Sequence, residues 1–262
     1  MSSERSDPQG GRAEDGEGTT HFGYSEVPVG DKARRVSAVF DSVAGRYDLM
    51  NDLMSGGMHR LWKRFALARA RVRPGERALD LATGSGDLAA GLARGLGERG
   101  HLVASDINAR MLERGRDRLT DAGFAGRVGF VQADAQCLPF PDRHFHCVTI
   151  GFGLRNVTDQ ARALAEMARV LRPGGRLVVL EFSRPAGAGF RRLYDTYSFT
   201  VLPRLGEWVA GDADSYRYLA ESIRMHPDQA TLAGMMADAG LVHCRWNNLT
   251  GGVVAVHTGY RA

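Results

Sequence analysis

The sequence predicts an α/β protein in which a mostly parallel sheet is covered by helices on both faces. Two observations support this fold class: short apolar runs follow one another after Pro74, and segments with helical periodicity separate most of them. Such alternation favours parallel pairing, because each helix carries the chain back across one face of the sheet. The expected strands are Arg77–Leu81, Leu102–Asp106, Val128–Gln132, His146–Gly151 and Gly175–Phe182. The expected helices between them are Asp87–Leu96, Ala109–Thr120 and Asp159–Leu171.

Further elements are expected on both sides of this alternating region. From Asp31, apolar side chains recur at three- and four-residue spacing, as on one face of an amphipathic helix. They are Val36, Val39, Phe40, Val43 and Tyr47. Other helices are expected over His59–Ala70, before the Pro74-Gly75 pair, and over Asp228–Ala239. The two last apolar runs, Leu241–Trp246 and Gly252–His257, are expected to pair antiparallel at an edge of the sheet.

The chain is predicted to have a disordered tail over residues 1–30 and a single domain over residues 31–262. Residues 1–20 are rich in serine, glycine and acidic side chains and show no periodicity. Within the domain, helices at the N-terminal end are expected to cover the core, and residues 191–225 are expected to form a helical insertion. The aromatic side chains of this insertion belong either to a plain core or to the wall of an apolar pocket. They include Tyr194, Tyr197, Phe199 and Trp208.

Composition places the chain among soluble globular proteins, at 44% hydrophobic and 24% charged residues. Apolar runs such as Leu177–Leu180 are too short to cross a bilayer. Three cysteines without close spacing suggest a reduced, cytoplasmic compartment. The net charge is +4, and residues 60–73 contain six Lys or Arg and no acidic residue. That basic segment is compatible with solvent, with nucleic acid or with an anionic lipid surface.

A glycine turn follows the first strand of the alternating region, in the stretch ALDLATGSGDLAAGL at residues 78–92. Glycines there let the backbone approach a ligand closely, and the helix that follows presents N–H groups to polar atoms. On its own the turn is equally compatible with a dinucleotide, another cofactor or a plain structural turn. No Lys or Arg lies in it to grip a phosphate, and Asp80 is adjacent. An acidic surrounding suits a cationic ligand better than a pyrophosphate.

Two further acids follow the next strands. Asp106 ends the second strand, 20 residues beyond Gly86, where a carboxylate accepts hydrogen bonds from ribose hydroxyls. Asp134 follows the third strand, where it is placed to accept from an adenine amino group. With the glycine turn and the helix-to-strand segment VLRPGGRLVVLEF at 170–182, these acids resemble the class I methyltransferases that use S-adenosylmethionine. The resemblance implies a Rossmann-like, mostly parallel seven-stranded sheet whose last strand is antiparallel.

Longer stretches resemble the ubiquinone/menaquinone biosynthesis C-methyltransferase family. They are THFGY at 20–24, VFDSVAGRYDLMNDLMSGGMHRLWKRF at 39–65, FGLRNVTD at 152–159, DADSYRYLAESIRMHPDQATL at 212–232 and NLTGGVVAVHTGYR at 248–261. The resemblance implies methyl transfer from S-adenosylmethionine to a ring carbon of a polyprenylated quinol. The expected reactions are demethylmenaquinol to menaquinol and the methylation of 2-methoxy-6-polyprenyl-1,4-benzoquinol.

The resemblance also implies which residues form the site. Cofactor contacts are expected at Gly84, Ser85, Asp106, Asp134, Ala135 and Gly151. Position 151 more often carries serine in that family, so any contact there is limited to the backbone. Arg155, in the loop after the fourth strand, is expected either to stabilise a phenolate or order a water, or to hold the loop through an ion pair. His59 and His226 are weaker candidates for a base, and no metal site is expected, because His144 and His146 stand without further ligands.

Other protein classes fit the sequence less well. A nucleic-acid methyltransferase is disfavoured, since the loop after the fourth strand reads GFGLRN and lacks the Asn/Asp-Pro-Pro-aromatic pattern of amino-group methylases. A non-catalytic nucleoside-binding module and a dehydrogenase that uses NAD are the remaining alternatives. Besides the quinol, the expected partners are the inner face of the membrane, through residues 60–73, and a second copy of the chain or other quinone-biosynthesis enzymes.

Overall fold

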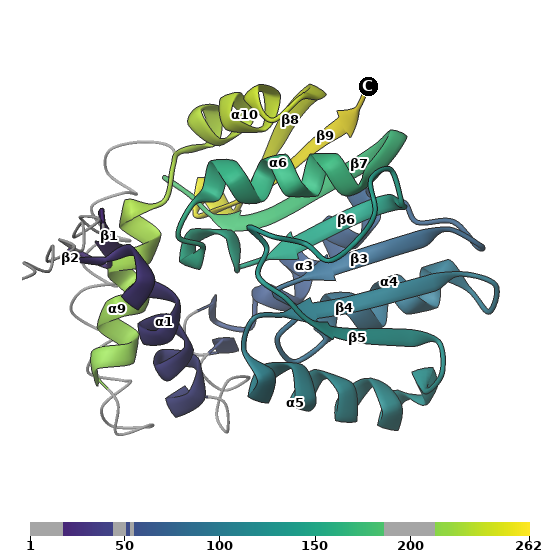
Figure 1. The fold of residues 1–262 in the computed structure, drawn as a ribbon, viewed down its shortest axis with the longest axis horizontal. Helices are drawn as coiled ribbons and strands as arrows, with labels where there is room; N and C mark the ends of the chain where they lie inside the picture. Colours follow the sequence, from purple (N-terminus) through teal and green to yellow (C-terminus); the bar gives the residue numbers. More distant parts are fainter. Residues whose placement is uncertain (1–17, 44–50, 53–54, 186–212) are drawn as a thin grey trace, which may run out of the picture.

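The computed structural model describes residues 18–43, 51–52, 55–185 and 213–262. Its main feature is a seven-stranded sheet with the strand order β5-β4-β3-β6-β7-β9-β8 (Figure 1). The strands are β3 (Arg77–Leu81), β4 (His101–Asp106), β5 (Val128–Gln132), β6 (Phe145–Gly151), β7 (Leu171–Phe182), β8 (Leu241–Leu249) and β9 (Val254–Arg261). All neighbouring pairs are parallel except those that β9 makes with β7 and β8. The predicted fold class and the antiparallel last strand are confirmed.

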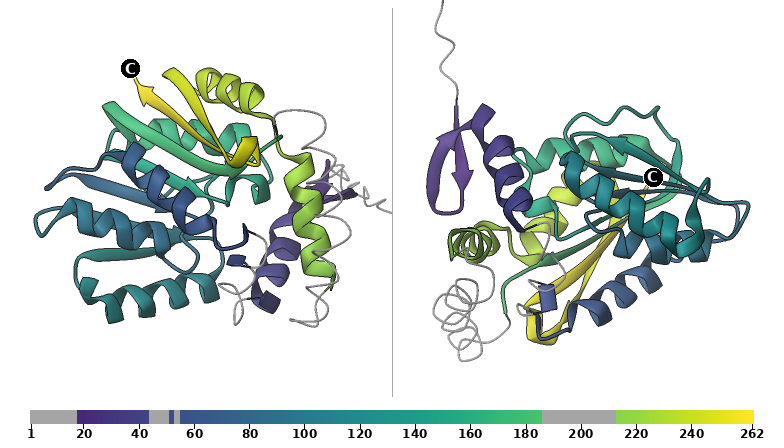
Figure 2. Two further views of the ribbon diagram at one scale, coloured as in Figure 1. Left: turned by 180° about the vertical axis from the view of Figure 1, so that it is seen from behind. Right: turned by 90° about the horizontal axis from the view of Figure 1, so that it is seen from below.

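Alternating side chains of the central strands enter two hydrophobic cores, one on each face of the sheet. On β3, Ala78 belongs to one core and Leu79 and Leu81 to the other, as the two-residue period of a strand requires. The first core is closed by α3 (His59–Ala70) and α4 (Asp87–Leu96), the second by α6 (Gln160–Val170) and α10 (Gln229–Asp238). Next to α4, α5 (Ala109–Leu119) covers the β4 and β5 end of the sheet. Helices therefore lie on both faces (Figure 2).

The N-terminal segment corrects one prediction. Instead of a disordered tail through residue 30, residues 19–28 form a hairpin of β1 (Thr19–Phe22) and β2 (Ser25–Pro28), followed by α1 (Val29–Val43). Phe22 stacks on Tyr218 of α9 (Ala213–Met225) with ring centroids 4.2 Å apart, and Val27 is buried. The stacking of Phe22 and the burial of Val27 give the short polar segment a folded position. Residues 1–17, and most of the predicted insertion at 191–225, lie outside the described residues.

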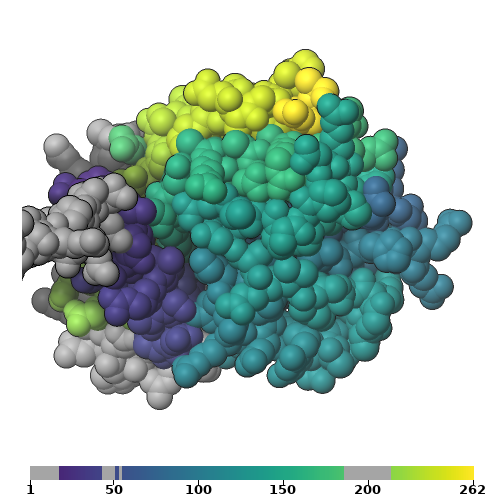
Figure 3. Space-filling model, viewed as in Figure 1, coloured from purple at the N-terminus to yellow at the C-terminus, as the bar shows by residue number. Residues whose placement is uncertain are grey.

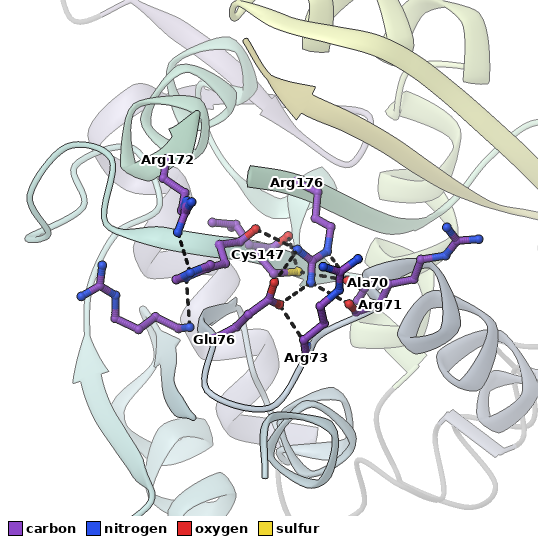
Figure 4. Close-up of polar contacts among 10 residues, drawn as sticks. Ala70, Arg71, Arg73, Glu76, Cys147, Arg172 and Arg176 are labelled. Carbon is purple, nitrogen blue, oxygen red and sulfur yellow. Dashed lines mark hydrogen bonds and ion pairs between the residues drawn. The ribbon is translucent and has the colours of Figure 1, made fainter. Parts of the chain in front are cut away.

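At the amino ends of the strands, Arg176 of β7 joins three parts of the fold (Figure 4). Its guanidinium donates to the carbonyl oxygens of Ala70 and Arg71, at the C-terminal end of α3, and to that of His146 on β6. Its Nη2 also lies 2.6 Å from Oε2 of Glu76, and both side chains are at most 15% exposed. A cation at these carbonyls satisfies acceptors that a helix end leaves open. This contact fixes α3 against the sheet, with His59 at the opposite, carboxyl end of the strands.

Replacing Arg176 with Ala is expected to lower the free energy of unfolding by about 3 kcal/mol, because the partner carboxylate stays buried without its cation. Chemical denaturation at pH 7 measures this change. Arg172→Ala is the matched control, since Arg172 is exposed and its side chain hydrogen-bonds the half-buried His146 ring; its effect is expected within about 0.5 kcal/mol.

The same pair predicts a dependence on pH. Burial alone would raise the pKa of Glu76, but hydrogen bonds from Arg176 and from the Arg73 N–H outweigh it and leave the pKa below its ordinary value. The pair of Glu76 and Arg176 therefore adds fully to the free energy of unfolding at pH values above the ordinary carboxyl pKa. This stabilisation is lost as the pH falls through the lowered pKa of Glu76. For the variants, an equal loss of unfolding free energy in Arg172→Ala and Arg176→Ala would contradict the role given to Arg176 in fixing α3 against the sheet.

Candidate active site

The glycine turn between β3 and α4 is held by the carboxylate of Asp106. Gly84 and Gly86 have φ values of 54° and 80°, in the left-handed region that favours glycine. The Gly84 N–H donates to Asp106 Oδ2 at 2.9 Å, so the end of β4 fixes the turn at the end of β3. From the other side, α5 approaches so closely that a Cβ on Gly115 would lie 2.7 Å from the Gly84 oxygen. The turn is thus rigidly placed at the carboxyl edge of the sheet.

A cavity with about 840 Å³ of empty volume lies over this turn. Its walls come from α1 and from the segments that follow β3, β4, β5 and β6, which are adjacent because the parallel strands all end at one edge. The residues expected to contact a cofactor that line this first cavity are Gly84, Asp106, Asp134, Ala135 and Gly151. Ser85 does not line it, since its side chain is buried within the turn. Five of the six predicted residues are therefore brought together around one space.

The two acids of the first cavity are held by different neighbours. Besides the Gly84 bond, Asp106 accepts from the Asn108 N–H through Oδ1 at 3.0 Å, and the Ile107 N–H acts on the same carboxylate. Burial raises its pKa against the effect of these N–H groups. Asp134 accepts from the backbone N–H and the side-chain amide of Gln136, at 2.9 Å each for the shorter contacts. Each carboxylate keeps acceptor capacity for a ligand.

Asp80, expected beside the ligand, lies beneath the turn and not on the cavity wall. It is 1% exposed, and its two oxygens accept from the hydroxyls of Thr149 and Thr83 at 2.5 and 2.8 Å. Burial raises its pKa to about 6, against the effect of these hydroxyls. Asp80 therefore supports the glycine turn and does not itself line the first cavity.

Helix α1 covers the first cavity and is fastened at two points that the sequence did not reveal. Asn108 donates from Nδ2 to the Ser37 hydroxyl at 2.8 Å and to Asp41 Oδ1 at 2.9 Å, while its own Oδ1 caps α5 by accepting from the Met111 N–H. At the other end, the buried Lys32 donates to the Val157 carbonyl at 3.1 Å. Figure 3 shows residues 18–43, in purple, seated against the teal surface of the sheet region. A ligand in the first cavity is therefore shielded from solvent by α1.

A second cavity, with about 550 Å³ of empty volume, adjoins the first. Phe40, Phe152 and Asn156 line both. Much of the remaining wall is apolar and includes Val39, Trp62, Phe182 and Leu219. Its other polar side chains come from three separate parts of the chain; they are Asn51, Ser55, His59, Arg155, Ser215 and Tyr218. A flat apolar ring with polar substituents suits such a space.

Arg155 lies on the wall of the second cavity and does not line the first. Its Nη1 donates to Glu181 Oε1 at 2.9 Å and to the Phe152 carbonyl at 2.5 Å, and its N–H donates to Glu181 Oε2 at 3.3 Å. The side chain is nearly fully buried and its guanidinium lies 5.3 Å from the centre of the Phe182 ring. These contacts hold the loop, one of the two expected roles, and leave Nη2 without a partner among the described residues.

The remaining candidates separate clearly. His59 lines the second cavity, whereas His226 is 2% exposed, lines neither cavity and has its pKa lowered to about 4 by burial. Tyr194, Tyr197, Phe199 and Trp208 lie outside the described residues. Within the described residues, no three His, Cys, Asp or Glu side chains are grouped to hold a metal ion. Glu181, at the end of β7, was missed; an acid closing a buried strand, as in Asp106, is the signal that marks it.

Solved structures with a similar arrangement include methyltransferases. A SAM-dependent methyltransferase of Thermotoga maritima matches with a TM-score of 0.61, covering 86% of this chain and 99% of that chain at 18% identity. One from Aquifex aeolicus matches with a TM-score of 0.59, covering 82% and 98% at 15% identity. At such identities the likeness establishes the fold, which is that of the class I methyltransferases.

Sequence similarity identifies the family. The ubiE/COQ5 methyltransferase family matches residues 29–261, and this chain belongs to it. The ubiquinone/menaquinone biosynthesis C-methyltransferase UbiE of Teredinibacter turnerae is 61% identical over 246 residues, or 94% of this chain and 99% of the relative. The protein of the same name from Pseudomonas aeruginosa (strain LESB58) is 58% identical over 255 residues, covering 97% and 99%. The resemblance found in the sequence is confirmed.

The contact between Asn108 and α1 makes a direct prediction. Asn108→Asp keeps the oxygen that caps α5 but puts a carboxylate in place of the Nδ2 donor, next to Asp41. We expect amide hydrogen exchange in α1 to become roughly tenfold faster, the effect of losing about 1.4 kcal/mol of local stability. Exchange in α5 should be unchanged. Adding Asp41→Asn removes the repulsion and should restore part of the protection; unchanged exchange in both variants would show that this contact does not hold the helix.

Proposed function

We propose that this chain transfers a methyl group from S-adenosylmethionine to a ring carbon of a polyprenylated quinol, in menaquinone biosynthesis, ubiquinone biosynthesis or both. The proposed acceptors are demethylmenaquinol and 2-methoxy-6-polyprenyl-1,4-benzoquinol. The observation that carries the proposal is the pair of adjoining cavities: an acidic one at the carboxyl ends of the strands, and a largely apolar one that shares its wall. Relatives 58–61% identical over nearly the whole chain carry the name of this activity.

The first cavity fits a nucleoside with a cationic tail. Its lining includes Asp106 and Asp134 and, among the described residues, no Lys or Arg, which disfavours the pyrophosphate of NAD. The Asp106 carboxylate would hold the ribose hydroxyls, and Asp134 with Ala135 would hold the adenine. The backbone of Gly84 and Gly151 would line the methionine part, and the buried Ser85 would support the turn beside it. When bound, S-adenosylmethionine supplies an electrophilic methyl group on a sulfonium.

The second cavity would hold the quinol ring. An aromatic carbon becomes a strong nucleophile when a neighbouring hydroxyl loses its proton, so the site must favour the phenolate, exclude water and align the reacting atoms. Trp62, Phe152 and Phe182 supply water exclusion and a flat wall. We assign Arg155 to the phenolate oxygen through Nη2; Glu181 and the Phe152 carbonyl use Nη1, and the other unused donor, Nε, is fully buried.

The quinol is a membrane lipid, and we propose a cytoplasmic protein that contacts the inner face of the membrane. The basic segment at 60–73 does not form one surface, because α3 runs from the carboxyl ends of the strands to their amino ends. In addition, Lys63 Nζ is paired with Asp87 Oδ2 at 2.6 Å. Its N-terminal end fits better: Met58 and Leu61 are 37% and 52% exposed beside the exposed Arg60 and Arg64. None of the helices described is long and apolar enough to cross a membrane. Self-association and contact with other quinone-biosynthesis enzymes belong to the same proposal.

Deleting the gene tests the function. We expect the strain to accumulate demethylmenaquinone, the unmethylated ubiquinone precursor, or both, as measured by quinone profiling, and a plasmid copy to restore the products. In calorimetry the purified protein should bind S-adenosylmethionine and not NAD. An unchanged quinone profile would refute the assignment.

Removing Arg155 alone would leave the Glu181 carboxylate buried without its cation, so the main variant changes both residues. The double variant Arg155→Gln, Glu181→Gln removes both charges and is expected to lower kcat about 100-fold, the effect of losing one donor to an oxyanion. Affinity for S-adenosylmethionine should be nearly unchanged. Glu181→Gln alone keeps the guanidinium and should keep most of kcat. If that single variant is as slow as the double variant, Arg155 acts only by holding the loop.

A further inference from the structure

Methylation of a quinol needs a group that takes the proton of the ring hydroxyl, and the second cavity contains a side chain suited to it. His59 lines this cavity at the start of α3 and is 6% exposed. Its Nδ1 lies 3.0 Å from the Ser55 hydroxyl oxygen. Its Nε2 has no hydrogen-bond partner among the described residues. A nearly buried ring with one nitrogen satisfied and the other open to a cavity is the arrangement expected of a base that meets its ligand there.

The hydrogen bonds around Ser55 determine which nitrogen carries the proton. The Ser55 hydroxyl donates to the Asn51 carbonyl at 2.6 Å, an acceptor that has no hydrogen to give. Because its single hydrogen is used there, the Ser55 oxygen can only accept from His59 Nδ1. It also accepts from the His59 backbone N–H at 3.2 Å. The neutral ring is therefore protonated on Nδ1 and has its lone pair on Nε2.

The surroundings keep this lone pair available at neutral pH. Burial lowers the pKa of His59 and Lys63 lowers it further, while the Asn51 carbonyl and Asp52 act in the opposite direction. Arg60 on the same helix lowers it as well, and Arg155 and Tyr218 are the other titratable groups on the cavity wall. Asp52 Oδ1 lies 3.7 Å from Nδ1, close enough to stabilise an imidazolium once it forms.

The other titratable side chains on the wall do not fit the role. The Arg155 guanidinium is a donor without an acceptor lone pair and is paired with Glu181. Tyr218 donates its hydroxyl to Asn156 at 3.0 Å, and burial raises its pKa to about 12. His226 does not line the cavity. His59 remains as the base among the described residues that line this space.

We propose that Nε2 of His59 is the general base for the quinol and that Ser55 is a positioning residue that fixes its tautomer; this rests on the proposed function. The hydroxyl proton of the quinol passes to Nε2, and the electron pair of the O–H bond moves into the ring. The ring carbon then forms a bond to the methyl carbon as the bond from methyl to sulfur breaks and its electron pair returns to sulfur. The methylated carbon loses its hydrogen as a proton to solvent, and His59 returns its own proton to the ring oxygen. One proton is released in all, as the charge of the donor requires.

His59→Asn is the test in the enzyme, because its amide nitrogen can replace Nδ1 as donor to Ser55 while no base remains. We expect kcat to fall about 100-fold or more, with affinity for S-adenosylmethionine and thermal stability near those of the wild type. The fall of kcat at acidic pH, which reports protonation of Nε2, should disappear. Imidazole added to His59→Ala should restore part of the rate in its unprotonated form. Ser55→Ala should lower kcat less than His59→Asn does.

A second readout needs no turnover. In ¹⁵N-histidine NMR of the wild-type protein at neutral pH, the His59 ring should show a protonated Nδ1 and an unprotonated Nε2. A ring protonated on Nε2 overturns the proposal, and so does a His59→Asn variant that keeps the full rate. Both outcomes presuppose wild-type protein that methylates a quinol; wild-type protein that binds S-adenosylmethionine but methylates none would refute the proposed function instead.

Discussion

At the end of β4, the Asp106 carboxylate accepts hydrogen bonds from the Gly84 and Asn108 N–H groups, and the first cavity is built outward from these two contacts. The Gly84 contact holds the turn that opens α4. The Asn108 contact places the side chain that caps α5 and fastens α1. A single carboxylate thus positions both the glycine turn beneath the cavity and the helix that covers it. These segments come together because β3, β4, β5 and β6 are neighbours in the sheet and run parallel, so that they all end at one edge.

The loop after β6 connects the first cavity to the second. Phe152 and Asn156 line both, and the loop is held from three directions. Glu181 of β7 anchors Arg155, Tyr218 of α9 bonds to Asn156, and Lys32 of α1 bonds to the Val157 carbonyl. Helices α1 and α9 lie side by side at this end of the molecule (Figure 1). Movement of either cover would therefore change the wall that the two ligands share, which couples closure of the site to alignment of the reacting atoms.

The sheet was predictable because its information is local, and the contacts within the site were not. The bounds predicted for Arg77–Leu81, Val128–Gln132 and Asp87–Leu96 match the structure, since short apolar runs mark the strands and a helical spacing of apolar residues marks the helix. The glycine turn and Asp106 could be found from their spacing. By contrast, the hairpin at 19–28 depends on Phe22 meeting Tyr218, almost 200 residues later, which no local pattern reveals. The ion pair between Arg155 and Glu181 also joins residues far apart in the sequence, so no local pattern predicts it. Ser55 and His59, by contrast, are four residues apart, a spacing at which side chains meet on a helix.

The proposed reaction removes a positive charge from the ligand in the first cavity and creates charges in the second. The charged side chains of each cavity suit the change that takes place there. The first is lined by two carboxylates and, within the described residues, by no cation, so it favours a positively charged ligand over the neutral one that remains after transfer. Transfer therefore weakens the hold on the spent donor. In the second, the Arg155 charge is largely balanced by Glu181, and the imidazole of His59 is neutral before it takes a proton. When the proton moves from the quinol to His59, a phenolate and an imidazolium form as a pair inside one low-dielectric space, so no net charge has to enter from water.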